Sequence, residues 1–287
     1  MMPKFSIADL IINILAPDWA IHENFKLFTT KEGEPDIECR VIFKGHQDIS
    51  VEGAQLIMET PKSKIYEING NILNISGDRK AYSITSKDWT TYKIYINSEY
   101  NDPNNEEIIQ KVKNGILASL RDLLIGALAQ KNGLIIHSST IIWQDTGIVF
   151  SAPSDTGKTT HTLLWQQMYQ TPVLDGDVTA CRINKDTPVV YGLPWCGTSG
   201  QFINASVPLG AIVFLQQSQE NSIIKLDFQE AFLRLTARCF LLPWNQRLMD
   251  QYLNTIQRIV GKVSCYLLNC LPNQESVELV KECLKKQ

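Results

Sequence analysis

The 287-residue sequence contains no Cys-x-x-Cys pair among its seven cysteines, and it has only four histidines. Structural zinc sites show paired ligands at close spacing, and disulfide frameworks usually show an even cysteine count in a short secreted chain. The sequence therefore predicts reduced thiols and no structural metal site. It also lacks the run of roughly 20 apolar residues that spans a bilayer. The apolar stretch 7–16 contains Asp9 and Asn13 and does not resemble a signal peptide, so we expect a cytoplasmic protein.

The sequence also lacks a large excess of positive or negative charge, because 27 Lys and Arg residues nearly balance 30 Asp and Glu residues and give a formal net charge of -3. This balance offers no electrostatic reason to expect nucleic acid or an anionic membrane as a partner. A hydrophobic fraction of 44% and a charged fraction of 20% are those of an ordinary globular protein with a sizeable core. The oligomeric state stays open, a homo-oligomer included.

The first hundred residues show the alternating apolar runs that are typical of strands. Such runs occur at 37–43, 66–75 and 91–96, and Asn69-Gly70 predicts a hairpin turn within the second of them. A loop rich in Asn, Asp, Ser and Pro follows at 97–105 and marks a boundary. We therefore predict a β-rich N-terminal region, residues 1–104, which could recognise a substrate or partner.

The rest of the chain, residues 105–287, is predicted to be an α/β domain. It begins with a long helix at 106–130, closed by Asn132-Gly133. Short apolar runs then alternate with helical segments, a pattern typical of an α/β layer. The further helices are expected at 157–169, 228–241, 249–259 and 275–284.

The clearest chemical signal is a strand at 147–150, then the loop 151–160, then a helix. A bound phosphate chain needs backbone N–H donors, a helix N-terminus, a cation and a hydroxyl for magnesium, and Gly157-Lys158-Thr159 supplies the last parts in order. The pattern G-x-x-x-x-G-K-[ST] is met except at Ala152, which replaces the first glycine. The residues expected to bind a nucleotide are Ser154, Asp155, Thr156, Gly157, Lys158, Thr159 and Thr160.

A second motif, Leu174-Asp175-Gly176-Asp177, ends the next predicted strand. Strands of such a sheet bring their carboxyl ends to one crevice, so a carboxylate here should face the phosphate loop. It could hold magnesium or take the proton from an attacking hydroxyl. Most nucleotide hydrolases with a phosphate loop place the magnesium aspartate much further along the sequence from the lysine. The short separation between Lys158 and Asp177 therefore distinguishes this chain from them.

Taken together, these segments resemble the HPr kinase/phosphorylase-related proteins, which share their kinase fold with ATP-type phosphoenolpyruvate carboxykinase. Some bacterial members are linked to the biosynthesis of modified peptides. The resemblance covers about residues 130–240. It rests on His137-Ser138, residues 147–151, the loop through Lys158-Thr159, residues 174–177 and residues 191–199.

The resemblance implies an ATP-dependent phosphotransferase that moves the γ-phosphate to a hydroxyl of a peptide, a protein or a small molecule. Lys158 would contact the β- and γ-phosphates, and Thr159 and Asp177 would hold magnesium. The catalytic residues implied are Asp177, Asp175 and His137. The acceptor pocket is expected to include Trp195, Gly197, Thr198, Ser199 and Arg238.

Two departures keep other readings open, because Ala152 and Asp155 stand where related loops usually have glycine. A catalytically degenerate module that binds a nucleotide or a peptide through its N-terminal strands is the main alternative. The carboxykinase reaction on a small keto acid is a further one, although no spacing in the sequence identifies its second metal or its arginines.

Overall fold

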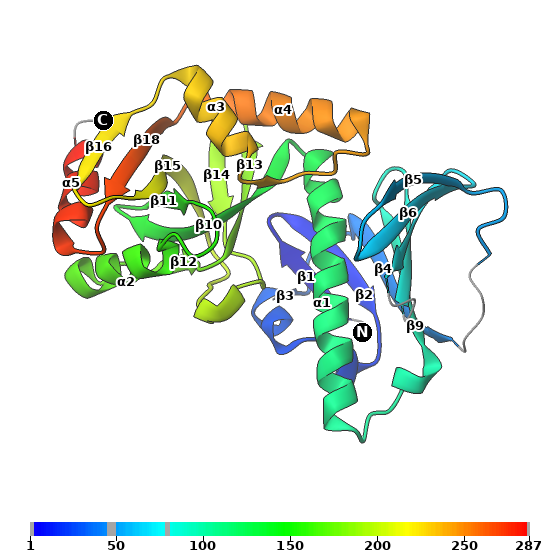
Figure 1. Ribbon diagram of the computed structural model, residues 1–287. Coiled ribbons are helices and arrows are strands. Elements are labelled where there is room, and N and C mark those ends of the chain that lie inside the picture. The colour runs from blue at the N-terminus through cyan, green and yellow to red at the C-terminus, as the bar shows by residue number, and fades with distance from the viewer. Residues whose placement is uncertain (1–2, 45–49, 78–80, 286–287) are drawn as a thin grey trace. The chain divides into compact units, whose positions relative to one another are not determined.

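The computed structural model describes residues 3–44, 50–77 and 81–285. The chain forms two compact units, which meet in sequence between Ala127 and Leu128. Each unit contains one large sheet (Figure 1). Among the described helices, none is long and apolar enough to cross a membrane. All seven cysteines are free thiols.

The first unit is built on a sheet whose strand order is β3-β1-β2-β4-β9-β8-β7-β6-β5 within the described residues. Its strands are β1 (Lys4–Ile7), β2 (Leu10–Leu15), β3 (Thr29–Thr30), β4 (Ile37–Lys44), β5 (Gln55–Glu59), β6 (Ser63–Ile68), β7 (Asn71–Ser76), β8 (Ala81–Ser86) and β9 (Thr91–Asn97). The predicted hairpin is confirmed, because β6 and β7 pair in antiparallel fashion around Asn69 and Gly70. Both turn residues have positive φ, as a tight hairpin turn requires.

Helix α1 (Glu106–Ala129) groups largely with this first sheet, although it was predicted to begin the second domain. Its glycine at position 126 lies against the ring of Trp89, where an added Cβ would come within 2.4 Å of ring atoms. The absence of a side chain therefore lets the helix approach the sheet closely. Short 3₁₀ turns at Asp18–Ala20, Glu23–Phe28 and Ser98–Tyr100 complete the unit.

The second unit contains a mixed sheet with the strand order β11-β10-β13-β14-β15-β18-β16. Strand β15 also pairs with β11 in parallel, so five strands close into a ring of pairings. Two short strands, β12 and β17, pair with β10. The strands are β10 (Gly133–Trp143), β11 (Thr146–Ser151), β12 (Val173–Asp175), β13 (Val178–Asn184), β14 (Thr187–Tyr191), β15 (Ser206–Gln217), β16 (Ser222–Lys225), β17 (Cys239–Phe240) and β18 (Ser264–Cys270).

Four helices pack on this second sheet in two pairs, α2 with α5 and α3 with α4 (Figure 1). They are α2 (Lys158–Tyr169), α3 (Phe228–Thr236), α4 (Gln246–Val260) and α5 (Gln274–Leu284). The α2–α5 side is held by a buried cluster in which Trp165 and Val277 meet Phe150 of the sheet. His161 belongs to the same interior: it is 3% exposed, and its Nε2 accepts a hydrogen bond from the Trp165 indole. Burial lowers the pKa of His161 to about 4.

Two local predictions are wrong in detail. The helix expected to reach residue 241 ends at Thr236, because the chain turns into β17, whose Cys239 and Phe240 pair with β10. Gly133 does not form a left-handed helix cap; Asn132 has the positive φ, and Gly133 opens β10 beside Arg182. An added Cβ on Gly133 would come within 2.7 Å of the Arg182 side chain, so close strand packing explains this glycine.

Candidate functional site

Strand β10 explains why residues far apart in sequence meet at one place. Strands β11 and β12 both run antiparallel to it, so they point in the same direction and end near each other. Ser151 at the end of β11 lies opposite Ser138, and Asp175 at the end of β12 lies opposite Thr140. The phosphate-type loop and the aspartate motif therefore leave the sheet side by side.

Hydrogen bonds fix these chain segments to the two residues at the middle of β10. The Ser151 hydroxyl donates to the His137 carbonyl at 2.7 Å. The Ser138 amide donates to the Asp177 carbonyl at 3.0 Å, and the His137 amide donates to the Arg238 carbonyl at 2.9 Å. His137 and Ser138 thus link the loop, the aspartate turn and the turn that follows α3.

The backbone of the loop between β11 and α2 suits its residues at Gly157 and Ala152 and less well at Asp155. Gly157 has φ 108°, a conformation that favours glycine, and it precedes the first turn of α2. Ala152 is buried and is not among the residues with positive φ, so the missing glycine there costs little strain. Asp155 does adopt the left-handed region, with φ 61°, and its carbonyl accepts a hydrogen bond from the Gln217 side chain.

Lys158 is almost buried, with 8% of its surface exposed, and it folds over its own loop. Its Nζ donates to the carbonyls of Ala152 and Pro153, both at 3.2 Å. Burial lowers the pKa of Lys158, and the Arg238 guanidinium adds to that effect, while Asp177 and Asp155 oppose it. An anion bound beside the ammonium would raise this pKa, because an opposite charge favours the protonated form.

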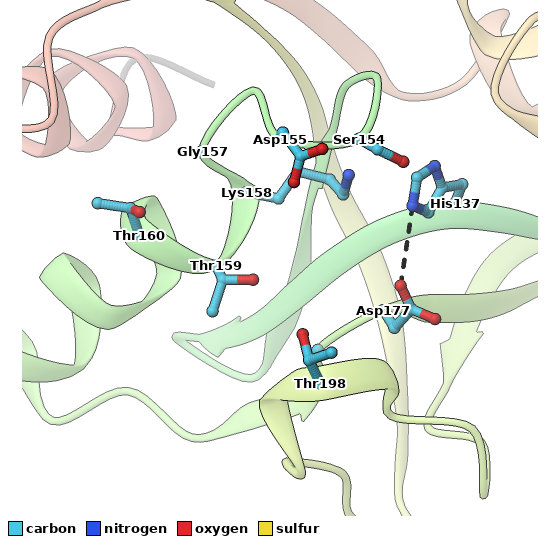
Figure 2. A pocket seen from close by; sticks show the side chains of 10 residues that line it. His137, Ser154, Asp155, Gly157, Lys158, Thr159, Thr160, Asp177 and Thr198 are labelled. Atoms are coloured by element: carbon cyan, nitrogen blue, oxygen red, sulfur yellow. Dashed lines mark ion pairs between the residues drawn. The ribbon is translucent and has the colours of Figure 1, made fainter.

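His137 and Asp177 face each other across the site, with 3.7 Å between His137 Nε2 and Asp177 Oδ1 (Figure 2). Burial lowers the pKa of His137, and the nearby charges of Lys158 and Arg238 lower it further, while Asp177 raises it. The imidazole is therefore neutral at neutral pH. A neutral imidazole beside a carboxylate can accept or relay a proton.

Asp175 was predicted to be catalytic, but its surroundings differ from those of Asp177. Its side chain is fully buried, and its two oxygens accept hydrogen bonds from the amides of Asp177 (3.0 Å), Val178 (3.1 Å) and Leu193 (2.9 Å). Burial raises the pKa of Asp175 well above its ordinary value, and the three amide donors oppose that shift. Asp175 thus shapes the turn that presents Asp177, and it is not among the residues that line the cavity described next.

A cavity of about 430 Å³ lies where these segments meet (Figure 2). Loop, helix, turn and strand all contribute to its wall. The lining residues are His137, Ser154, Asp155, Gly157, Lys158, Thr159, Thr160, Gly176, Asp177 and Thr198. Six of the seven predicted nucleotide-binding residues are in this set, and Thr156 is not.

Comparison with known families assigns the chain to one of them. Residues 107–273 match the family model described as SynChlorMet cassette protein ScmC. The chain belongs to the ScmC family. No curated protein matches it.

Among solved structures, the Hpr(Ser) kinase/phosphatase from Coxiella burnetii is similar to this ScmC-family chain. The likeness covers 53% of this chain and 97% of the other, at 10% sequence identity and a TM-score of 0.35. The family that the comparisons show for this chain is ScmC.

The segment 195–200 enters the site less than the sequence suggested. Trp195 is buried, and the Ser199 hydroxyl donates to the Cys196 carbonyl at 2.6 Å, so both support the loop itself. Thr198 lies at the cavity wall. Gly197 packs directly on Asp177, because an added Cβ would come within 2.7 Å of the Asp177 carboxyl carbon.

Two further residues complete this picture. Gly176 lines the cavity and has no room for a side chain, since an added Cβ would come within 2.0 Å of the Ser199 hydroxyl. Gly176 was not among the predicted site residues, and its position between two aspartates was the signal that could have indicated it. Arg238 does not line the cavity, but its charge acts on both His137 and Lys158.

Proposed function

We propose that this chain is an ATP-dependent kinase that transfers a phosphoryl group to a hydroxyl. The single observation that carries the proposal is the meeting of Lys158, Thr159, Asp177 and His137 around one cavity at a helix N-terminus. The acceptor would be a serine or threonine of a peptide or protein, or a small alcohol.

The residues present fit a nucleotide with its magnesium ion. Helix α2 has 12 residues, and its first-turn amides and positive end favour phosphate at the cavity. The described residues contain no group of three or more His, Cys, Asp or Glu side chains that could hold a metal alone. This agrees with magnesium, which is usually held by one or two carboxylates together with substrate phosphates.

In this proposal Thr159 and Asp177 would hold the magnesium ion, and the amides of residues 154–160 would hold the phosphates. The bound nucleotide supplies the phosphoryl group, and its metal neutralises developing charge. Lys158 adds a fixed positive charge in a partly enclosed site, where it acts more strongly than in water.

Asp177 would also accept the proton of the acceptor hydroxyl. Its neighbour His137, neutral and 3.7 Å away, can stabilise the protonated carboxyl or pass the proton on. Asp175 keeps the Asp177 amide in place and thereby positions the base. Thr198 stands at the wall opposite the loop and is a candidate contact for the acceptor.

The test combines binding and transfer in two variants. Calorimetric titration with magnesium and ATP should show binding to the wild type and to Asp177→Asn, and at least a hundredfold loss in Lys158→Ala, because a charge-assisted phosphate contact is lost. Incubation with γ-labelled ATP and a pool of serine- and threonine-containing peptides should label peptide only with the wild type. Lys111→Ala, an exposed lysine of the first unit, is the matched control and should bind as the wild type does.

Normal transfer by Asp177→Asn would contradict the role given to that aspartate. Formation of phosphoenolpyruvate from oxaloacetate and ATP would favour the carboxykinase reaction instead.

A second candidate, a binding module without transfer, is favoured by one observation. Asp155 brings a carboxylate into the phosphate loop, where it opposes an anionic ligand. Strand β5 lies at the end of the first sheet and is an edge to which an extended peptide could add. Peptide capture that is equal with and without nucleotide, and that leaves the peptide unphosphorylated, would favour this module over the kinase.

A further inference from the structure

Asp155 is the residue of the loop whose negative charge opposes phosphate binding. It lies at the cavity wall, its backbone is left-handed with φ 61°, and its side chain is exposed. Aspartate tolerates this conformation better than most residues do, although glycine is the common choice. The Gln217 side chain donates to its carbonyl at 3.3 Å, so the end of β15 helps to hold it there.

The charges that line the cavity sum to a negative value. The lining residues with formally charged side chains are Asp155, Asp177 and Lys158, that is, two carboxylates and one ammonium. Arg238 is close enough to act on Lys158 but is not part of the wall. A bare triphosphate would therefore enter a cavity in which two carboxylates face one ammonium.

A divalent cation weakens this repulsion. Bound between the phosphates and Asp177, it would cancel two negative charges of the ligand and so reduce the repulsion between Asp155 and the ligand. Without Asp155 the cavity lining would be neutral, and a free polyphosphate would meet no net repulsion. The binding free energy lost because of the Asp155 carboxylate thus depends on whether the ligand carries its metal ion.

We propose that Asp155 makes phosphate binding conditional on a divalent cation, so that the loop selects the metal complex over the free anion. This inference rests on the proposed phosphate-binding function of the loop. One unit charge about 5 Å from a multiply charged anion in a solvated cavity changes affinity by roughly tenfold. The selectivity should weaken as salt is added, since exposed charges are screened.

The experiment titrates inorganic tripolyphosphate and ATP, each with excess magnesium or with excess chelator, into three proteins. These are the wild type, Asp155→Asn and Asp145→Asn. Asparagine keeps the preference for the left-handed backbone and removes the charge. Asp145 is the matched control, since it is also exposed, has φ 60° and is not among the residues that line the cavity.

The wild type and Asp145→Asn should bind the free anions at least tenfold more weakly than the magnesium complexes. In Asp155→Asn that difference should shrink by about tenfold, chiefly through tighter binding of the free anions. Asp155→Gly should behave in the same way, which guards against an effect specific to asparagine.

The possible failures can be told apart. Equal binding of both forms by the wild type, or an unchanged ratio in both Asp155 variants, would overturn the inference and leave the loop function standing. Absence of binding of either ligand, in either form, to the wild type and to both Asp155 variants would overturn the proposed function and this inference together.

Discussion

Replacing Asp175 by alanine should destabilise the second unit, because this carboxylate satisfies three backbone amides in the interior. The donors are Asp177, Val178 and Leu193, at 3.0, 3.1 and 2.9 Å. Each buried donor left without a partner costs about 1–3 kcal/mol, and removal of a buried carboxylate returns part of that, so we expect a net loss of about 4 kcal/mol. Asparagine keeps one acceptor oxygen, and its loss should be about half as large.

The assay is urea unfolding, monitored by hydrogen–deuterium exchange in peptides that span residues 173–193. These peptides report on β12 and its surroundings and separate this unit from the N-terminal one. Asp177→Asn is the matched comparison, because the Asp177 side chain is 35% exposed and its loss should change stability by less than about 1 kcal/mol. If Asp175→Ala and Asp177→Asn unfold at the same urea concentration, Asp175 does not stabilise the turn and the reasoning is refuted.

Two further predictions use matched positions in the same unit. Folding holds the pKa of His161 at about 4, below its unfolded value near 6.5, so its neutral form stabilises the protein above pH 6.5 and that contribution is lost as pH falls towards 4. Between pH 7 and pH 4.5 the free energy of unfolding, measured with urea, should therefore fall by about 2–3 kcal/mol more in the wild type than in His161→Gln. Equal losses in the two proteins would contradict a buried neutral imidazole. Gly197→Ala should reduce phosphoryl transfer at least tenfold while magnesium–ATP still binds, because the new Cβ would meet the Asp177 carboxyl at 2.7 Å. Gly200→Ala is the control, since it has similar backbone strain, with φ 67°, but open space around it. An equal loss of transfer in both variants would show that backbone strain alone is responsible.

The sequence was most informative where local chemistry decides the structure. The loop, the following helix and Asp177 were predicted from residue order, since a Gly-Lys-Thr segment between a strand and a helix leaves the chain few alternatives. The structure brings Lys158, Asp177 and His137 to one cavity. Their proximity depends on β10, which pairs with both neighbouring strands, and such pairings are not visible in a single sequence.

Long-range packing decided the features that the sequence did not predict. Asp175 and Asp177 were both predicted to be catalytic, whereas the burial of Asp175 and the distant Leu193 amide that donates to it show that Asp175 points inwards. The β13–β14 hairpin was missed because its turn residues are Lys185 and Asp186, which carry positive φ without any glycine or asparagine. Asp186 accepts salt bridges from α4 and the segment after it, so tertiary contacts stabilise a turn that local preference would not select.

The middle of β10 carries a further consequence, which concerns tolerance to change. Backbone groups of His137 and Ser138 and one serine hydroxyl link the loop, the aspartate turn and the turn after α3. These contacts do not depend on which side chains stand at positions 137 and 138. A one-residue insertion between His137 and Thr140 would be different, because it would reverse the faces of all residues beyond it and separate the pairings with β11 from those with β13. We expect that natural relatives vary freely in the length of their surface turns but keep the length of this short segment unchanged.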